Sequence, residues 1–274
     1  LAIQPARGSS GYMWTYDEAA VVDRSSIIER SLINVDNNRL ATKLHKVSID
    51  NGSVMPLGSD GSITVQPLDV PADDTCWTMG KLVASPGVAA FVQYLMMQTT
   101  EKPVLGPPCL PVPRRLAWTS VRPDGTSITA RVDATTFDPT EGVREFIPTK
   151  SGALYVLTMA LVATNTAMMF APVLRVRKYL PSGMLDTSYG TNGVATIDSA
   201  IDDIAVGFNE PRAAMDDAGN LYIATVRPEG DSQVAAVIRL TATGQVDRAP
   251  GKKAHAPVDG NARVTREEVL RRRA

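Results

Sequence analysis

The sequence predicts an all-β fold: a β-propeller-like array of about four blade-type repeats, with a short C-terminal helical tail. Three observations predict this class. Two glycine-centred turns recur along the chain, strand-forming runs separate them, and convincing helical periodicity occurs only near the end of the sequence. Several short strands per repeat, with turn signals between them, are typical of four-stranded blades. We expect units at approximately 1–60, 61–130, 131–190 and 191–250, followed by a tail over 251–274.

The first recurring turn is followed by a strand-forming run. Residues 151–156 (SGALYV) closely match residues 218–223 (AGNLYI). Weaker copies centre on Gly11 and Gly80, so the four glycines lie 69, 72 and 67 residues apart. Glycine adopts the positive φ of a tight turn without steric cost. The motif therefore predicts one hairpin in each repeat.

The second recurring turn lies between runs in which apolar residues alternate. Its four copies are centred on Gly52, Gly125, Gly183 and Gly244. Asn-Gly and Pro-Asp-Gly at such places are strong hairpin signals. A glycine-rich corner follows two of these turns, in residues 57–64 (LGSDGSIT) and 189–196 (YGTNGVAT). Each repeat is thus expected to contain a strand, a turn, a second strand, a corner and a further strand.

Two segments have features of a helix. Residues 17–32 partly suit a helical period, but their β-branched residues and paired serines favour strand and loop. Residues 251–274 carry seven basic and three acidic residues, and they begin as a linker. Thr265 and Glu268 form a capping box, with arginines in the last turn, which predicts a short helix. This basic tail is either a docking arm for an acidic partner surface or a solvated end.

One segment carries a family resemblance. Residues 180–194 (LPSGMLDTSYGTNGV) resemble the motif of the delta-60 repeat family, bacterial and often exported β-propeller-like repeats, with Tyr189 where phenylalanine is usual. Residues 216–223 (DDAGNLYI) resemble its upstream pattern. The resemblance is good over 173–247 and rests on periodicity alone over 45–172. It implies the fold and an exported setting, periplasmic or extracellular, and it carries over no catalytic residues.

The repeats do not decide whether the sheets close into a ring. The chain begins at a first-type turn, and the last second-type turn, at Gly244, is followed by the linker without a glycine-rich corner. The half-units at the two ends could complete one shared blade and close a small ring. Alternatively, the chain is an arc completed by another protein chain or by a second copy. A β-fold that is not a propeller is the third alternative.

A proline-rich stretch interrupts the second unit. Residues 102–113 (KPVLGPPCLPVP) match no strand, because proline cannot donate a ladder hydrogen bond. We expect an extended inserted loop, with Pro107 and Pro108 as candidate binding residues, or alternatively a packed structural loop. Cys76 and Cys109 are the only cysteines; they are a candidate disulfide that would pin this loop, or two buried thiols.

Composition excludes several functions. A formal net charge of −1 argues against a polyanion-binding protein, and 5% aromatic residues are few for a stacking platform, so we expect no nucleic-acid partner. No apolar stretch is long enough to predict a membrane span. The sequence contains neither a nucleophile elbow nor a phosphate-binding loop, and only two histidines. We therefore predict no catalytic residue, no metal site and no cofactor.

These observations predict a non-catalytic binding or scaffold subunit that makes protein–protein contacts in a larger assembly. The candidate contact residues are Pro107 and Pro108 in the insertion, together with Arg271, Arg272 and Arg273 in the tail. The alternative is a propeller-type hydrolase or lyase with acidic residues around a channel, or the accessory subunit of a multi-chain enzyme. A third class, carbohydrate binding, would need exposed aromatic platforms. Its candidates are Trp14, Trp77 and Trp118, which we interpret as core residues.

Overall fold

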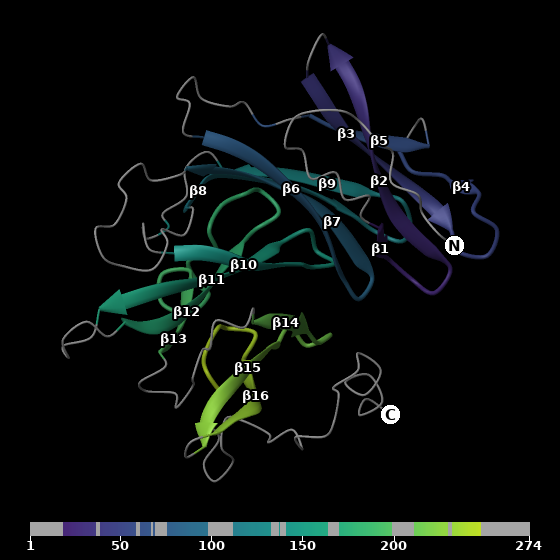
Figure 1. Ribbon diagram of the computed structural model, residues 1–274. Coiled ribbons are helices and arrows are strands. Elements are labelled where there is room, and N and C mark those ends of the chain that lie inside the picture. The colour runs from purple at the N-terminus through teal and green to yellow at the C-terminus, as the bar shows by residue number, and fades with distance from the viewer. Residues whose placement is uncertain are drawn as a thin grey trace.

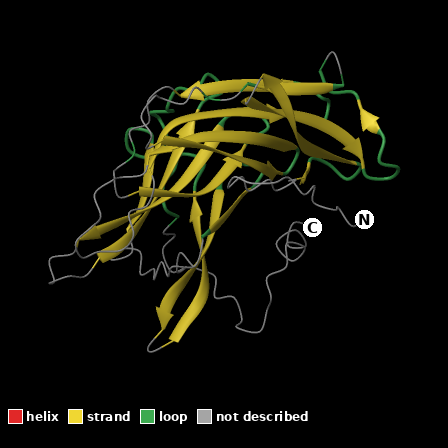
Figure 2. Cartoon of the chain, turned by 45° about the horizontal axis from the view of Figure 1, so that its top comes forward, coloured by secondary structure: helices red, strands yellow, loops and turns green. Residues whose placement is uncertain are grey.

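In the computed structural model, the described part of the chain runs from residue 19 to residue 247. Within that range the description omits 37–38, 59–60, 67, 69–75, 98–111, 133–136, 138–140, 164–169, 199–210 and 230–231. Figure 2 shows strands joined by turns and loops, and no helix occurs among the described residues. The prediction of an all-β fold is confirmed. The predicted C-terminal helix and the turn at Gly11 lie outside the described residues.

Sixteen described strands form four antiparallel sheets that follow one another along the chain. Sheet one contains β1 (Ala19–Val21), β2 (Ser26–Asp36), β3 (Arg39–Ser48), β4 (Val54–Met55) and β5 (Ser62–Val65). Sheet two contains β6 (Cys76–Ser85), β7 (Val88–Met97), β8 (Val112–Val121) and β9 (Ser127–Val132). Sheet three contains β10 (Glu141–Pro148), β11 (Leu154–Ala163), β12 (Phe170–Tyr179) and β13 (Val194–Asp198). Sheet four contains β14 (Arg212–Met215), β15 (Leu221–Glu229) and β16 (Ser232–Leu240).

The sheets are stacked like the blades of a propeller. Their first strands lie side by side in order, β1 beside β6, β6 beside β10, and β10 beside β14. In Figure 1 the sheets run from purple through teal and green to yellow, and the first and the last lie at opposite ends of an arc. We call the face of a sheet that points to the preceding sheet its leading face, and the opposite face its trailing face. The fold is a β-propeller-like array of four blade-type sheets.

Each neighbouring pair of sheets shares one hydrophobic cluster. Ile28 and Leu44 of sheet one meet Phe91 of sheet two. The next cluster joins sheets two and three and is centred on Trp118, Phe146 and Val156. The last joins sheets three and four and is centred on Leu157, Leu174 and Ile223. Side chains alternate between the two faces of a strand, so a central sheet has apolar residues at consecutive positions, one for each neighbour.

The predicted turns at Gly125, Gly152, Gly183, Gly219 and Gly244 are confirmed, and both kinds have the same geometry. In the turn 149–153, the amide of Gly152 donates to the carbonyl of Thr149 (2.9 Å), and the amide of Thr149 donates to the carbonyl of Ala153 (2.9 Å). The same pair of hydrogen bonds forms around Gly125, Gly183, Gly219 and Gly244, and the φ angles of these five glycines lie between 80° and 91°. Such hairpins need a left-handed residue, which only glycine adopts at little cost.

The interpretation of Gly80 as a turn was wrong. Gly80 lies inside β6 opposite Gln93, and the β6–β7 turn contains Gly87 instead, with a φ of 75°. A Cβ at position 80 would stand 2.5 Å from the ring of Phe91. The glycine is therefore explained by the close approach of this buried aromatic ring and not by a turn.

All the glycine turns lie at one end of the sheets. Because β10 runs to a first-type turn and β12 to a second-type turn, the antiparallel order places both at the same end, which we call the turn end. Lys150 of one first-type turn pairs with Asp217 of the next (3.3 Å), which shows that neighbouring sheets share this orientation. At the opposite loop end, β7 finishes at Met97 and β8 begins at Val112, so the connection between them starts and finishes there. The expectation that residues 102–113 match no strand was wrong for the last two, because Val112 and Pro113 begin β8 and pair with Met97 and Met96.

Candidate functional site

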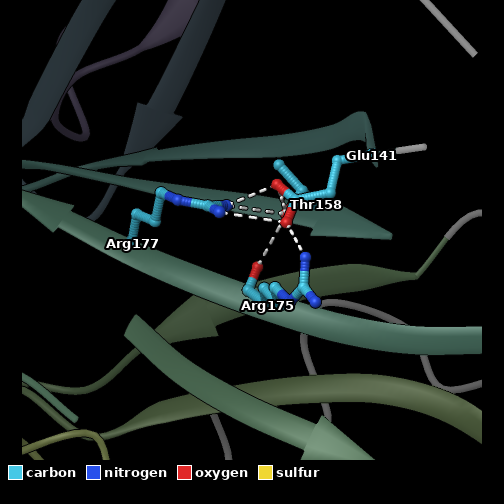
Figure 3. A network of polar contacts seen from close by, with 4 residues as sticks. All are labelled: Glu141, Thr158, Arg175 and Arg177. Carbon is cyan, nitrogen blue, oxygen red and sulfur yellow. Dashed lines mark hydrogen bonds and ion pairs between the residues drawn. The ribbon is translucent and has the colours of Figure 1, made fainter. Parts of the chain in front are cut away.

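A buried ionic cluster lies at the loop end of sheet three (Figure 3). The carboxylate of Glu141 is fully buried and accepts two hydrogen bonds from the guanidinium of Arg177, Nη1 to Oε2 at 2.6 Å and Nη2 to Oε1 at 3.0 Å. Arg175 also pairs with Oε1 of Glu141. Thr158 Oγ1 lies 3.2 Å from Oε2 and accepts a hydrogen bond from Arg177 Nη1 (3.2 Å). One carboxylate is thus held by two arginines and one hydroxyl.

Strand register brings these four residues together. Glu141 is the first residue of β10, Thr158 lies on β11, and the two arginines lie two positions apart on β12, so both point to the same face. Thr158 is the direct cross-strand partner of Arg175. The ring centre of Phe137 lies 4.5 Å from the guanidinium carbon of Arg177 and covers it. The cluster therefore points into the contact between sheets two and three, where Phe137 belongs to the shared hydrophobic cluster.

None of these four residues belongs to a motif that marked a candidate site in the sequence. The alternation Arg-x-Arg inside a strand-forming run was a signal that two arginines share a face. Nothing in the sequence indicated that Glu141, 34 residues before Arg175, faces them. Because its carboxylate is buried and paired on both oxygens, the arrangement suits an ionic tie between strands better than acid–base chemistry.

At the turn end, a glycine of each later sheet packs against the backbone of the sheet before it. Gly125 of sheet two lies against Pro56, Gly183 of sheet three against Arg131, and Gly244 of sheet four against Gly190. In each case, a Cβ on the glycine would lie closer to a backbone atom of the preceding sheet than ordinary van der Waals contact allows. The turn-end contact between sheets three and four, which we call the last joint, also has a hydrogen bond, from the amide of Gly190 to the carbonyl of Thr243 (2.8 Å).

The aromatic residue of the delta-60-like motif helps to build this last joint. Tyr189 is 1% exposed, and its ring meets that of Tyr155 edge-on at a centroid distance of 5.3 Å. Burial raises the pKa of the Tyr189 hydroxyl well above its ordinary value. Tyr189 is therefore a neutral packing residue between sheets three and four.

A group of tyrosine, cation and aspartate occurs twice on trailing faces. In sheet three, Lys178 lies opposite Tyr155 across the strands and pairs with Asp186 at 2.8 Å. In sheet four, Arg239 lies opposite Tyr222 and pairs with Asp247 at 2.7 Å. The hydrogen bond from Lys178 is the main cause that lowers the pKa of Asp186, and hydrogen bonds from Ser188 add to it.

The two copies differ in exposure. In sheet three the side chains of Lys178 and Asp186 are 25% and 12% exposed, whereas in sheet four those of Arg239 and Asp247 are 42% and 29% exposed. Sheet four covers the trailing face of sheet three. No described sheet follows sheet four, and on its trailing face Ala224 and Ala235 are exposed and Val237 is half-buried.

The leading face of sheet one is the other open end of the arc. A row of apolar residues crosses four adjacent strands of this face, because Val21 pairs with Ile27, Ile27 with Val47, and Val47 with Val54. Val21 is 49% exposed and Val54 is 63% exposed. Ile49, in the adjoining turn, is 50% exposed. Exposed apolar rows of this kind are typical of interaction surfaces rather than of solvated sheets. We name the two open surfaces, the leading face of sheet one and the trailing face of sheet four, the end faces.

Most of the residues that the sequence singled out lie outside the described part of the chain. These are Pro107, Pro108, Cys109, Arg271, Arg272, Arg273 and Trp14. Cys76 begins β6, and Trp77 follows it. The disulfide and the contacts of the insertion and the tail therefore stay predictions. Trp118 is a core residue, as predicted: it is 1% exposed, and its Nε1 donates to the carbonyl of Gly152 (3.0 Å).

Within the described ranges, no group of three or more metal-binding side chains gathers in one place. No helix in that part of the chain is long and apolar enough to cross a membrane.

Comparison with known proteins adds little. No protein-family model and no curated protein matches the sequence. Five chains of solved structures match, among them Drosophila Semaphorin 2a, with 10% sequence identity and a TM-score of 0.30. That match covers 93% of this chain, which spans 56% of the semaphorin chain.

Proposed function

We propose that this chain is a non-catalytic binding subunit, which makes protein–protein contacts in a larger assembly through the end faces of its blade array. The observation that carries the proposal is the apolar row of sheet one, Val21–Ile27–Val47–Val54, whose first and last residues are exposed and whose middle residues are half-buried. Covering such a row with a partner would remove apolar surface from water at about 25 cal/mol per Å². The proline-rich insertion and the basic tail are further contact surfaces in this proposal.

Two other observations argue against the alternative functions, the first against a hydrolase or lyase and the second against carbohydrate binding. The fully buried carboxylate at the loop end, that of Glu141, is held by Arg175 and Arg177 inside a packed contact between sheets. The buried tryptophan at position 118 supports the core and offers no platform for a sugar ring. The resemblance to delta-60 repeats supports an exported, bacterial setting, which we include in the proposal.

Native mass spectrometry of the protein isolated from its source tests this function. We expect a complex heavier than the 29.3 kDa of one chain. A single species at the mass of one chain, at all concentrations that the source supplies, would contradict a binding subunit that works in an assembly. The mass of the complex also separates a multiple of this chain from a complex with a different protein.

A further inference from the structure

We propose that the two end faces are the two halves of one interface between copies of this chain. The trailing face of sheet four in one copy docks on the leading face of sheet one in a second copy, and the second copy does the same in return. This inference rests on the proposed function and names the partner. The physical basis is that each half has repeat-equivalent residues inside the chain that are covered by a neighbouring sheet.

The apolar row of sheet one has covered equivalents in sheets three and four. In every case the row is the set of cross-strand partners next to the turn end, on the leading face. The equivalent rows are Pro148–Leu154–Tyr179–Leu185 in sheet three and Met215–Leu221–Leu240–Val246 in sheet four. Leu154, Leu221 and Leu240 are fully buried against the sheet before them. The row of sheet one is likewise apolar and has the same position, yet Val21 and Val54 are 49% and 63% exposed, and Ile27 and Val47 are only half-buried.

The second-type turns repeat this difference. Gly125, Gly183 and Gly244 each pack against the backbone of the preceding sheet, whereas a Cβ at Gly52 would meet no atom within 4 Å. All four glycines have positive φ, so the turn itself is the same kind of left-handed position. Among the described residues, no edge of a preceding sheet lies beside the Gly52 turn.

The trailing face of sheet four repeats that of sheet three. Residues of β11 and β15 correspond at a spacing of 67, and residues of β12 and β16 at a spacing of 61. The cross-strand pairs of sheet three are Tyr155–Lys178, Leu157–Val176 and Met159–Leu174, and those of sheet four are Tyr222–Arg239, Ala224–Val237 and Val226–Ala235. Leu157, Val176 and Leu174 are fully buried by sheet four, whereas Ala224 and Ala235 are exposed. This apolar face is thus built like the covered one, but no described sheet follows it.

The two end faces are complementary. Sheet one needs the trailing face of a sheet before it, and sheet four needs the leading face of a sheet after it. In one chain these faces stay exposed and lie at opposite ends of the arc (Figure 1). A second copy offers both missing faces at once, and two reciprocal head-to-tail contacts close the assembly without leaving an open end. The resulting ring has eight sheets.

Light scattering coupled to size-exclusion chromatography of the purified chain tests the proposal. We expect a mass about twice the 29.3 kDa of one chain at micromolar concentration. Val54→Lys on sheet one and Val237→Glu on sheet four each place a charge in both contacts of the dimer, and we expect each to raise its dissociation constant at least tenfold. Met184→Glu is the matched control, because Met184 is 68% exposed but lies on neither end face. Unfolding curves in urea establish that the variants stay folded.

Mixing the two variants identifies the head-to-tail arrangement. A mixed dimer of Val54→Lys and Val237→Glu has one contact that carries both charges and one that is entirely wild type. We therefore expect the mixture to regain dimer that neither variant forms alone. A wild-type chain that stays monomeric at about 100 µM overturns the second copy as partner, while a complex with another protein from the source would leave the proposed function standing. A dimer that neither substitution weakens, or that mixing does not restore, also overturns this interface.

Discussion

Gly183, in the turn that follows β12, lies directly against the backbone of Arg131 at the edge of the preceding sheet. The φ of Gly183 is 88°, so the position is left-handed as well as crowded. The joint between sheets two and three therefore places two demands on this residue, one on its backbone conformation and one on its size.

We expect Gly183→Ala to cost about 3 kcal/mol of unfolding free energy, because left-handed alanine costs roughly 1 to 2 kcal/mol and the crowding adds a similar amount. Gly61→Ala is the matched control, since Gly61 has a φ of 70° but nothing within 4 Å of its Cβ position. That control should lose only about 1 kcal/mol. Urea unfolding followed by tryptophan fluorescence gives both values. Equal losses in the two variants would show that the backbone of Arg131 moves away from an added Cβ at little cost, and that the contact between sheets two and three is not tightly packed.

The ionic cluster of sheet three predicts strong coupling between its members. Glu141→Gln leaves Arg175 and Arg177 facing each other without the carboxylate, and we expect it to destabilise the fold by about 3 kcal/mol. Arg177→Met alone should cost a comparable amount, because it leaves the buried Glu141 with less compensation. The free energy of unfolding lost in the double variant should be smaller than the sum of the two single losses by about 1 kcal/mol or more. A double-mutant cycle in urea measures this coupling, and simple additivity would contradict the geometry of Figure 3.

The pairing of Lys178 with Asp186 predicts a dependence of stability on pH. The hydrogen bond from Lys178 lowers the pKa of Asp186 below its ordinary value of 3.8, so folding favours the ionised form. This contribution is present at pH values above the pKa of the unfolded chain and is lost as the pH falls through the lower pKa of the folded chain. Its size is about 0.5 to 1 kcal/mol, because the pair is partly exposed.

We therefore expect Asp186→Asn to be less stable than the wild type at pH 7 and the difference to shrink as the pH falls below about 4. Thermal unfolding between pH 2 and pH 7 measures it. Asp217→Asn serves as the control, because the Lys150–Asp217 pair is 64% and 77% exposed, and we expect no change above about 0.5 kcal/mol. A difference for Asp186→Asn that stays constant down to pH 2 would exclude an ionised partner for Lys178.

Local signals in the sequence predicted the hairpins well and their register poorly. The glycines at 125, 152, 183, 219 and 244 all form the turns that their motifs predict, because a left-handed position is a local demand that glycine meets. Gly80 has the same spacing in the sequence, but it lies in a strand to make room for Phe91. A glycine needed for a turn and a glycine needed for a close approach look alike when only one chain segment is visible.

The candidate sites could be predicted less well than the fold. The proline-rich insertion and the basic tail stood out because their composition is unusual, whereas the exposed row of sheet one consists of ordinary apolar residues in strands. In sequence, Val21, Ile27, Val47 and Val54 cannot be told from the apolar residues of a covered sheet. Their exposure depends on whether another sheet lies next to them, which no local pattern contains.

The sequence by itself determined the all-β class, the repeated hairpins and the near-zero net charge, because turn chemistry, strand propensity and net charge are properties of short segments or of the whole composition. Only the tertiary structure decided that Glu141 meets Arg175 and Arg177, that Tyr189 seals the joint to sheet four, and that the two end faces of the arc are open. The physical reason is that these features arise from strand register and from the stacking of sheets, which bring together residues from different strands and different repeats. Burial is a relation between such residues, and it exists only once the chain has folded.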